Sequence, residues 1–132
     1  TDLEWLVIAA CGPLQDALVT PGYVGSVSRW VPAFQGLHIL MGYATVSGDN
    51  ELEGRTLVNY MTRTFWGIVI SKTIVDSWFR TAIDIQGSDV IVGAMYLANN
   101  AANPGSDYLP GYGTSSSDPW PPTYGIAMWT YC

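Results

Sequence analysis

The sequence predicts an α/β fold in which a short, mainly parallel sheet is flanked by helices. Short, continuously apolar runs have the length and composition of strands that are buried on both faces. Amphipathic stretches with helical periodicity lie between these runs. Strands that alternate with helices are typical of right-handed crossover connections and a parallel sheet.

Three apolar runs are predicted as the buried strands, and each is bounded by turn-forming residues. They are EWLVIAA at 4–10, closed by Gly12-Pro13, LHILMGY at 37–43, and VIVGAMYL at 90–97. A fourth run, at 125–131, is a possible terminal strand. The sheet therefore has three strands whose order in the chain alternates with helices.

Three helices are predicted between the strands. A short one begins at Ser26 or Ser28 and ends at Gly36, and another spans about 73–83 after a Ser or Thr cap. The third spans about 51–65, since four apolar residues fall on one helical face: Leu57, Val58, Met61 and Phe65.

The chain divides by composition into an α/β portion at 1–98 and a segment at 99–132 that is rich in Gly, Pro, Ser and Tyr. Its aromatic residues favour an ordered loop, packed on the same domain, over a disordered linker. The candidate interface residues, which could instead form a sugar-binding platform, are Trp120, Tyr108, Tyr112 and Tyr124.

The composition indicates a protein that needs partners. Only 12% of the residues are charged and 48% are hydrophobic, whereas ordinary domains carry about 25% charged residues. Low charge leaves a large apolar exterior, which usually marks an interface. The net charge of −6 and the lack of a basic cluster exclude a nucleic-acid partner, and no apolar run approaches the roughly 20 residues of a membrane span.

A sheet of three parallel strands is small, and its unpaired edges are a liability that complete domains cover. We therefore expect further strands from outside this chain. They would come from an upstream half of the same domain or from neighbouring copies in a homo-oligomer.

Five motifs follow one another along the chain: WLVIAACG, RWVPAFQGLHILMGYAT, EGRTLVNYM, TIVDSWFRTA and GSDYLPGYG. This series resembles a bacterial family of unknown function within the caspase-like and gingipain-like cysteine peptidases, and the resemblance covers about residues 4–132. It implies an incomplete caspase-like three-layer sandwich, of which this chain is the C-terminal half. It also implies that Cys11 stands at the nucleophile position and that the catalytic His lies on an earlier strand.

The residues themselves leave other interpretations of Cys11 and His38 open. Cys11 could be a structural thiol, or could form a disulfide with Cys132 that closes almost the whole chain. His38, the only histidine, lies within an apolar strand and is expected to be buried and hydrogen-bonded or to lie at an interface. A pH-sensitive contact is the alternative.

No metal and no cofactor are expected. Asp49, Glu51, Glu53 and Gly54 match part of a calcium loop, but its twelfth position would be Tyr60 rather than Glu. Acids at a helix N-terminus explain the same residues.

Three functions follow as hypotheses. The first is a non-catalytic or assembly-forming domain in a larger, secreted or extracellular bacterial structure. The second is part of a cysteine endopeptidase that is inactive in this chain alone. The third is a carbohydrate-binding module that uses the aromatic C-terminal segment.

Overall fold

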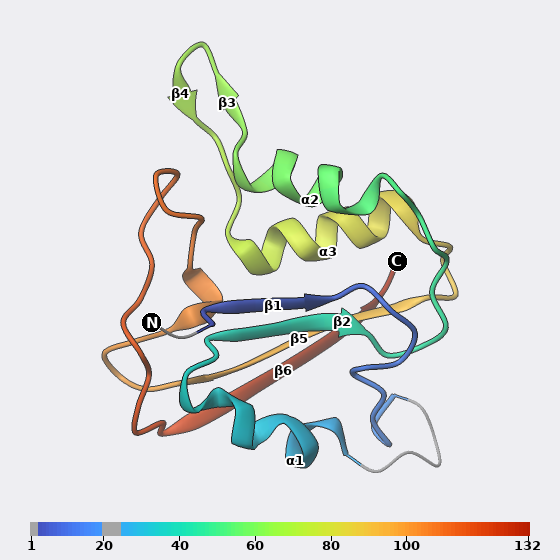
Figure 1. The fold of residues 1–132 in the computed structure, drawn as a ribbon, viewed down its shortest axis with the longest axis vertical. Coiled ribbons are helices and arrows are strands. Elements are labelled where there is room, and N and C mark those ends of the chain that lie inside the picture. The colour runs from blue at the N-terminus through green and yellow to red at the C-terminus, as the bar shows by residue number, and fades with distance from the viewer. Residues whose placement is uncertain (1–2, 20–24) are drawn as a thin grey trace.

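The computed structural model describes residues 3–19 and 25–132 and shows a mixed α/β fold (Figure 1). Its strands and helices follow one another along the chain as β1 (Trp5–Ile8), α1 (Ser26–Trp30), the 3-10 helix η1 (Val31–Gln35), β2 (Ile39–Tyr43), α2 (Glu53–Met61), β3 (Thr64–Phe65), β4 (Ile68–Val69), α3 (Ile74–Ile85), β5 (Ile91–Ala98), the 3-10 helix η2 (Pro104–Ser106) and β6 (Tyr124–Tyr131).

The main sheet has the strand order β1-β2-β5-β6 in the described part of the chain. Strands β1 and β2 are parallel, and Trp5 lies beside Ile39. Strand β5 runs antiparallel to both of its neighbours, β2 and β6. The prediction of a mainly parallel sheet is therefore wrong, since only one of the three strand pairs is parallel.

The helices between the strands explain these directions. One helical segment, α1 with η1, carries the chain from the end of β1 back to the start of β2, which makes this pair parallel. Between β2 and β5 the chain passes through two helices, α2 and α3, which pack against each other. Two helices return the chain to the end of the sheet from which it left, so β5 runs opposite to β2 (Figure 1).

Helices cover both faces of the sheet. Helices α2 and α3 lie on one face, and α1 with η1 lies on the other (Figure 1). On the α3 side, Trp78 is fully buried against Tyr43, with ring centroids 5.1 Å apart. Its indole N–H donates to the Gly93 carbonyl at 3.2 Å, which fixes α3 on β5.

Local sequence signals place α3 and the short α1 correctly. Thr73 caps α3, since its side-chain oxygen accepts from the Asp76 N–H at 3.1 Å. Helix α1 begins at Ser26, and the 3-10 helix that continues it ends before Gly36. The terminal strand is also confirmed as β6.

The predicted helix at 51–65 is too long. Helix α2 ends at Met61, and Phe65 lies in β3 with 62% of its surface exposed. Strands β3 and β4 form a hairpin whose two-residue turn, Trp66-Gly67, has positive φ at both positions. Strand pairing across this turn ends the helix earlier than the apolar pattern predicts.

The segment at 99–123 is ordered and leads into β6. Polar contacts hold it: the Thr123 N–H donates to the Ala98 carbonyl, and Ser71 Oγ donates to the Tyr112 carbonyl. Trp120 is 57% exposed and Tyr124 is 43% exposed, so these aromatic rings are not what fixes it. Within residues 3–19 and 25–132, no helix is long and apolar enough to cross a membrane.

Candidate functional site

Cys11 lies just beyond the C-terminal end of β1 and is exposed. Side chains at this end of parallel strands often bind ligands or carry catalytic groups. In the described part of the chain, the hydrogen-bond partners of its sulfur all belong to Ser47: Sγ accepts from the Ser47 N–H at 3.4 Å and contacts the Ser47 carbonyl at 3.6 Å. Cys11 therefore has no acid–base partner from this part of the chain.

Hydrogen bonds from α1 and β6 hold the loop that carries Cys11. The Pro13 carbonyl accepts from Arg29 at 2.7 Å and from the Trp30 indole at 2.9 Å, and the Leu14 carbonyl accepts from the Trp129 indole at 3.2 Å. These bonds fix the position of the thiol relative to the end of β1.

His38 lies at the opposite end of the sheet from Cys11. It immediately precedes β2, which runs parallel to β1, so it stands where these strands begin and Cys11 stands where β1 ends (Figure 1). The only histidine of the chain therefore cannot serve as a base for Cys11.

The disulfide that was one of the alternatives for Cys11 is not formed, since Cys11 and Cys132 are both free thiols. They follow the two edge strands β1 and β6, with β2 and β5 between them. Three strand spacings amount to about 14 Å, whereas bonded cysteines have Cα atoms within about 7 Å of each other. Burial, followed by the charge of Glu53, raises the pKa of the Cys132 thiol.

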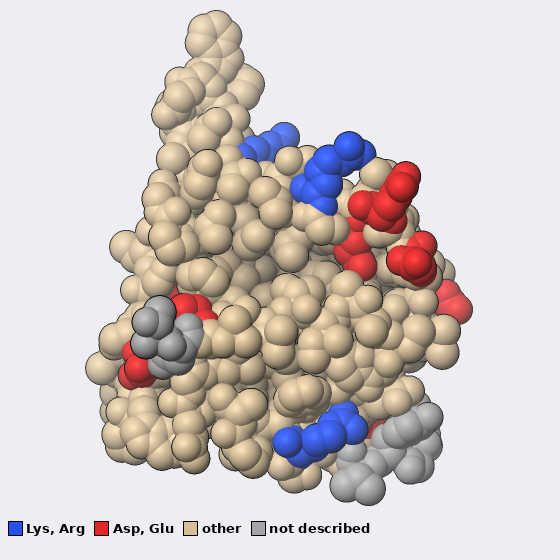
Figure 2. Space-filling model, viewed as in Figure 1, with Lys and Arg blue, Asp and Glu red and all other residues tan. Residues whose placement is uncertain are grey.

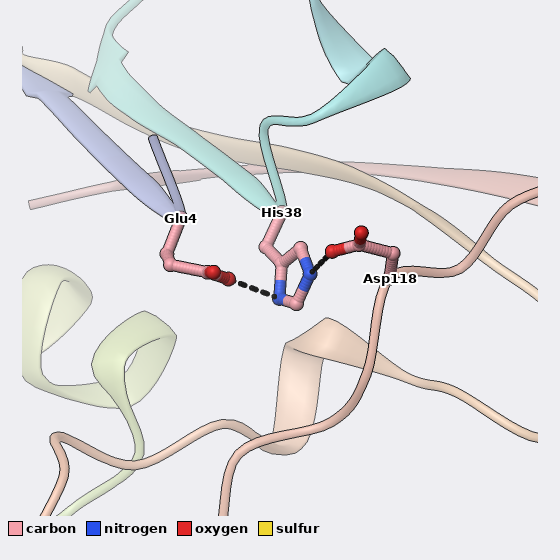
Figure 3. Close-up of side chains that lie close together, drawn as sticks. All are labelled: Glu4, His38 and Asp118. Atoms are coloured by element: carbon pink, nitrogen blue, oxygen red, sulfur yellow. Dashed lines mark hydrogen bonds and ion pairs between the residues drawn. The ribbon is translucent and has the colours of Figure 1, made fainter. Parts of the chain in front are cut away.

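His38 is the centre of a polar cluster in which His38 and Asp107 are buried and Glu4 and Asp118 reach the surface (Figure 3). Its Nδ1 lies 3.1 Å from Asp107 Oδ2 and 3.2 Å from Glu4 Oε2, and its Nε2 lies 2.9 Å from Asp118 Oδ1. Ionised carboxylates only accept hydrogen bonds, so both ring nitrogens must carry a proton to satisfy these contacts. The arrangement is that of an imidazolium ion held between carboxylates.

The protonation of His38 follows from two opposing effects. Burial by itself would lower the pKa of His38, since it disfavours the charged ring. Hydrogen bonds to Asp118 and Asp107, together with the charges of Glu4 and Asp107, outweigh burial and raise the pKa above its ordinary value of 6.5. The carboxylates around His38 therefore favour its charged form.

Asp107 connects the cluster to the rest of the fold. It is fully buried, and its Oδ1 accepts from the N–H and the hydroxyl of Ser116 at 2.7 and 2.6 Å. Its Oδ2 also accepts from the Trp5 indole at 3.4 Å, and its carbonyl accepts from the Ile74 N–H at 2.8 Å. The cluster thus ties the C-terminal segment to the starts of β1, β2 and α3.

Glu4, His38 and Asp118 could also be considered as metal ligands, because their ligand atoms lie within 4.8 Å of one another. An imidazole with carboxylates is a donor set that suits several divalent metals. The carboxylates, however, lie beside different ring nitrogens (Figure 3). A metal on either nitrogen would have to displace a proton, so the geometry fits an imidazolium better.

The apolar run around His38 correctly predicts that this residue is buried but does not indicate its partners. Asp107 and Asp118 lie 69 and 80 residues further along the chain, in an irregular segment without a spacing pattern. Of the four candidate interface aromatics, Trp120 and Tyr124 are exposed, and Tyr108 and Tyr112 are half-buried.

Together, these features define a mixed α/β domain in which the thiol at the end of β1 has no base among the described residues and the buried histidine is bonded to carboxylates. The profile of the domain of unknown function DUF6345 matches residues 1–131, and the chain belongs to this family. No curated protein and no solved structure matches the chain.

Proposed function

We propose that this chain is a non-catalytic, assembly-forming domain whose β1 edge pairs with a strand of another polypeptide. The observation that carries the proposal is the position of β1. It is an edge strand of the main sheet, and its four residues, Trp-Leu-Val-Ile, are all apolar and half-buried. An edge strand of this kind invites strand addition unless something covers it.

The backbone direction identifies the groups available for pairing. The Ile39 N–H donates to the Glu4 carbonyl, so the backbone of Glu4 faces β2. Direction alternates along a strand, so Leu6 and Ile8 face β2 as well, and the backbone groups of Trp5 and Val7 point to the free edge. Trp5 and Val7 are therefore the residues that another strand would contact.

Either of two strands could occupy this edge: one from an upstream half of the same domain or one from a neighbouring copy. The former would complete a caspase-like sandwich, an idea supported by the parallel β1/β2 pair and by the thiol at the end of β1. The latter would give a homo-oligomer. We place the assembly outside the cell, in a larger bacterial structure, because a weakly charged, aromatic-rich exterior suits permanent contacts.

Val7→Pro tests the edge with little harm to the fold. Proline lacks the N–H that would bind an added strand, and it is tolerated where that N–H points away from the sheet. Val7→Ala is the matched control, because it shortens the side chain and keeps the N–H. We expect Val7→Pro to dissociate the particle in light scattering and Val7→Ala to leave it intact. An unchanged particle with Val7→Pro would refute strand addition at β1.

A cysteine endopeptidase is the second candidate, and the exposure of Cys11 beside the free edge of β1 favours it. A strand added to β1 would lie about 4.8 Å away and could bring a base to the thiol. The thiolate would then attack the scissile carbonyl to form an acyl-enzyme, while the protonated base would give its proton to the leaving amine.

A peptidyl acyloxymethyl ketone tests this candidate on the complete protein. Labelling confined to Cys11, and lost in Cys11→Ser, would support a peptidase and would overturn the non-catalytic proposal. Cys132 is an internal control, since its half-buried thiol has a raised pKa and should react slowly. Labelling of neither cysteine would exclude the peptidase.

A carbohydrate-binding module remains a third candidate because Trp120 and Tyr124 are exposed. Aromatic rings of this kind can stack on sugar faces. Binding on a glycan array that is lost in Trp120→Ala would support it, and the absence of any binding would exclude it.

A further inference from the structure

Residues 63–72, here called the arm, project from the body of the domain beyond α2 and α3 (Figure 1). Strands β3 and β4 form the arm, and the Ile70 N–H donates to the Arg63 carbonyl at its base. Every residue from 63 to 70 is exposed. The arm therefore rests on little of its own protein.

The exposed side chains of the arm are mostly apolar, and apolar residues lie on both faces of the hairpin. The exposed fractions are 62% for Phe65, 88% for Trp66, 66% for Ile68, 47% for Val69 and 45% for Ile70. Phe65 is paired with Ile68, and Val69 is the partner of Thr64, so successive apolar residues point to opposite faces of the hairpin. A flat protein surface would cover only one of these faces, whereas an apolar phase would surround both.

The turn at the tip holds a residue that costs stability. Trp66 has φ of 51° and Gly67 has φ of 76°, the arrangement of a type I′ turn. Asn is preferred at the first of these positions, and a bulky aromatic residue there is strained. Backbone strain of this kind is concentrated at functional positions. A large amphipathic ring at this exposed tip is therefore better explained by binding than by folding.

Basic residues flank the apolar tip. Residues 54–75 contain Arg55, Arg63 and Lys72 and no acidic residue, although the chain as a whole has a net charge of −6. Arg63 and Lys72 stand at the two ends of the arm, and the Lys72 N–H is bonded to the Tyr60 carbonyl of α2. In Figure 2 the projecting part of the arm shows no charged side chain, and basic side chains lie near its base.

We propose that the arm inserts into an anionic lipid surface. Trp66 and its apolar neighbours would enter the boundary between headgroups and acyl chains, where aromatic residues are preferred. Arg63 and Lys72 would meet the phosphates. Trp66 is the third residue after Arg63, which at strand spacing is about 10 Å, and this matches the roughly 5–10 Å depth of interfacial segments.

The arm is too short to span a bilayer, and shallow insertion keeps its unpaired backbone groups within reach of water. This role is independent of strand addition at β1, because β3 and β4 form a sheet of their own and are not part of the main sheet. A second copy of the chain is the competing occupant. The apolar cavity of about 340 Å³ beside β6, lined among others by Phe34, Met95 and Ile126, could take one aromatic ring but would leave most of the arm uncovered.

Sedimentation with vesicles tests the proposal on the complete chain. The probes are vesicles of phosphatidylcholine mixed with phosphatidylglycerol, and vesicles of phosphatidylcholine alone. We expect Trp66→Asn to lower the partition coefficient about ten-fold or more and to unfold at the same temperature or higher. Leu18→Asn is the matched control, since Leu18 is 81% exposed outside the arm and should not affect binding.

The basic residues give a separate readout. Each charge at an anionic surface changes partitioning about five-fold, so Arg63→Gln with Lys72→Gln should lose about 25-fold on the mixed vesicles only. Failure of the unmodified chain to bind the mixed vesicles, or equal binding by Trp66→Asn, would overturn the proposal. So would a lipid-free oligomer that Trp66→Asn converts to a monomer, because the arm would then bind a second copy.

Discussion

Replacing Asp107 by Asn should strongly destabilise the domain, because every acceptor position of this buried carboxylate is in use. One oxygen accepts two bonds from Ser116, and the other accepts from His38 and the Trp5 indole. An Asn side chain keeps only one accepting oxygen. Its NH2 group would face two groups that are themselves hydrogen-bond donors. The loss of a charge-assisted bond and a neutral bond, with buried donors left unpaired, costs about 3–5 kcal/mol.

This loss is a large part of the roughly 5–15 kcal/mol by which such domains are stable. Urea denaturation followed by tryptophan fluorescence measures it directly. Asp118→Asn is the matched control: its side chain is 57% exposed and makes one bond to the same imidazole, so it should cost no more than about 1 kcal/mol. Equal losses in the two variants would refute the assignment of Asp107 as the residue that connects the His38 cluster to the rest of the fold.

Two further predictions concern pH and packing. The pKa of His38 is raised in the folded chain, so protonated His38 contributes its full share of the free energy of unfolding below about pH 6.5. This contribution is lost as the pH rises through the pKa of the folded state, with a slope of up to about 1.4 kcal/mol per pH unit. Denaturation series from about pH 6 to about pH 9 should show this decline in the native chain and not in His38→Gln; a flat native profile would contradict it. Gly93→Ala should cost about 1–3 kcal/mol, because its new methyl group would lie 2.7 Å from the Trp129 ring. Gly54→Ala in α2 meets nothing within 4 Å and should be neutral or stabilising by up to about 1 kcal/mol; equal losses in a thermal melt would argue against the packing of β5 on β6.

Local signals in the sequence were sufficient for most individual elements. The Thr73 cap and the apolar stripe of α3 lie within one short window, as do the apolar runs of β2 and β5. Short stretches of sequence of this kind could not indicate whether β5 runs parallel or antiparallel to β2. This direction depends on the antiparallel packing of α2 on α3, which is a tertiary contact.

The arm was missed because Phe65 continues the helical spacing of Leu57 and Met61. The competing signal was present, since Trp66-Gly67 lies between Thr-Phe and Ile-Val-Ile, and a Gly-containing pair between β-forming residues indicates a hairpin. The partners of His38 could not be predicted. Asp107 and Asp118 reach it only through the path of the ordered segment after β5, which no local pattern describes.

Hydrogen exchange at β1 in the complete protein, as its cell makes it, tests the central claim most directly. The amides of Leu6 and Ile8 face β2 and should exchange slowly whether or not a partner is present, so they are internal controls. The amides of Trp5 and Val7 face the free edge. If another strand is added there, both should exchange as slowly as Leu6. Fast exchange of Trp5 and Val7, beside slow exchange of Leu6 and Ile8, would show an unpaired edge and would contradict the proposed assembly.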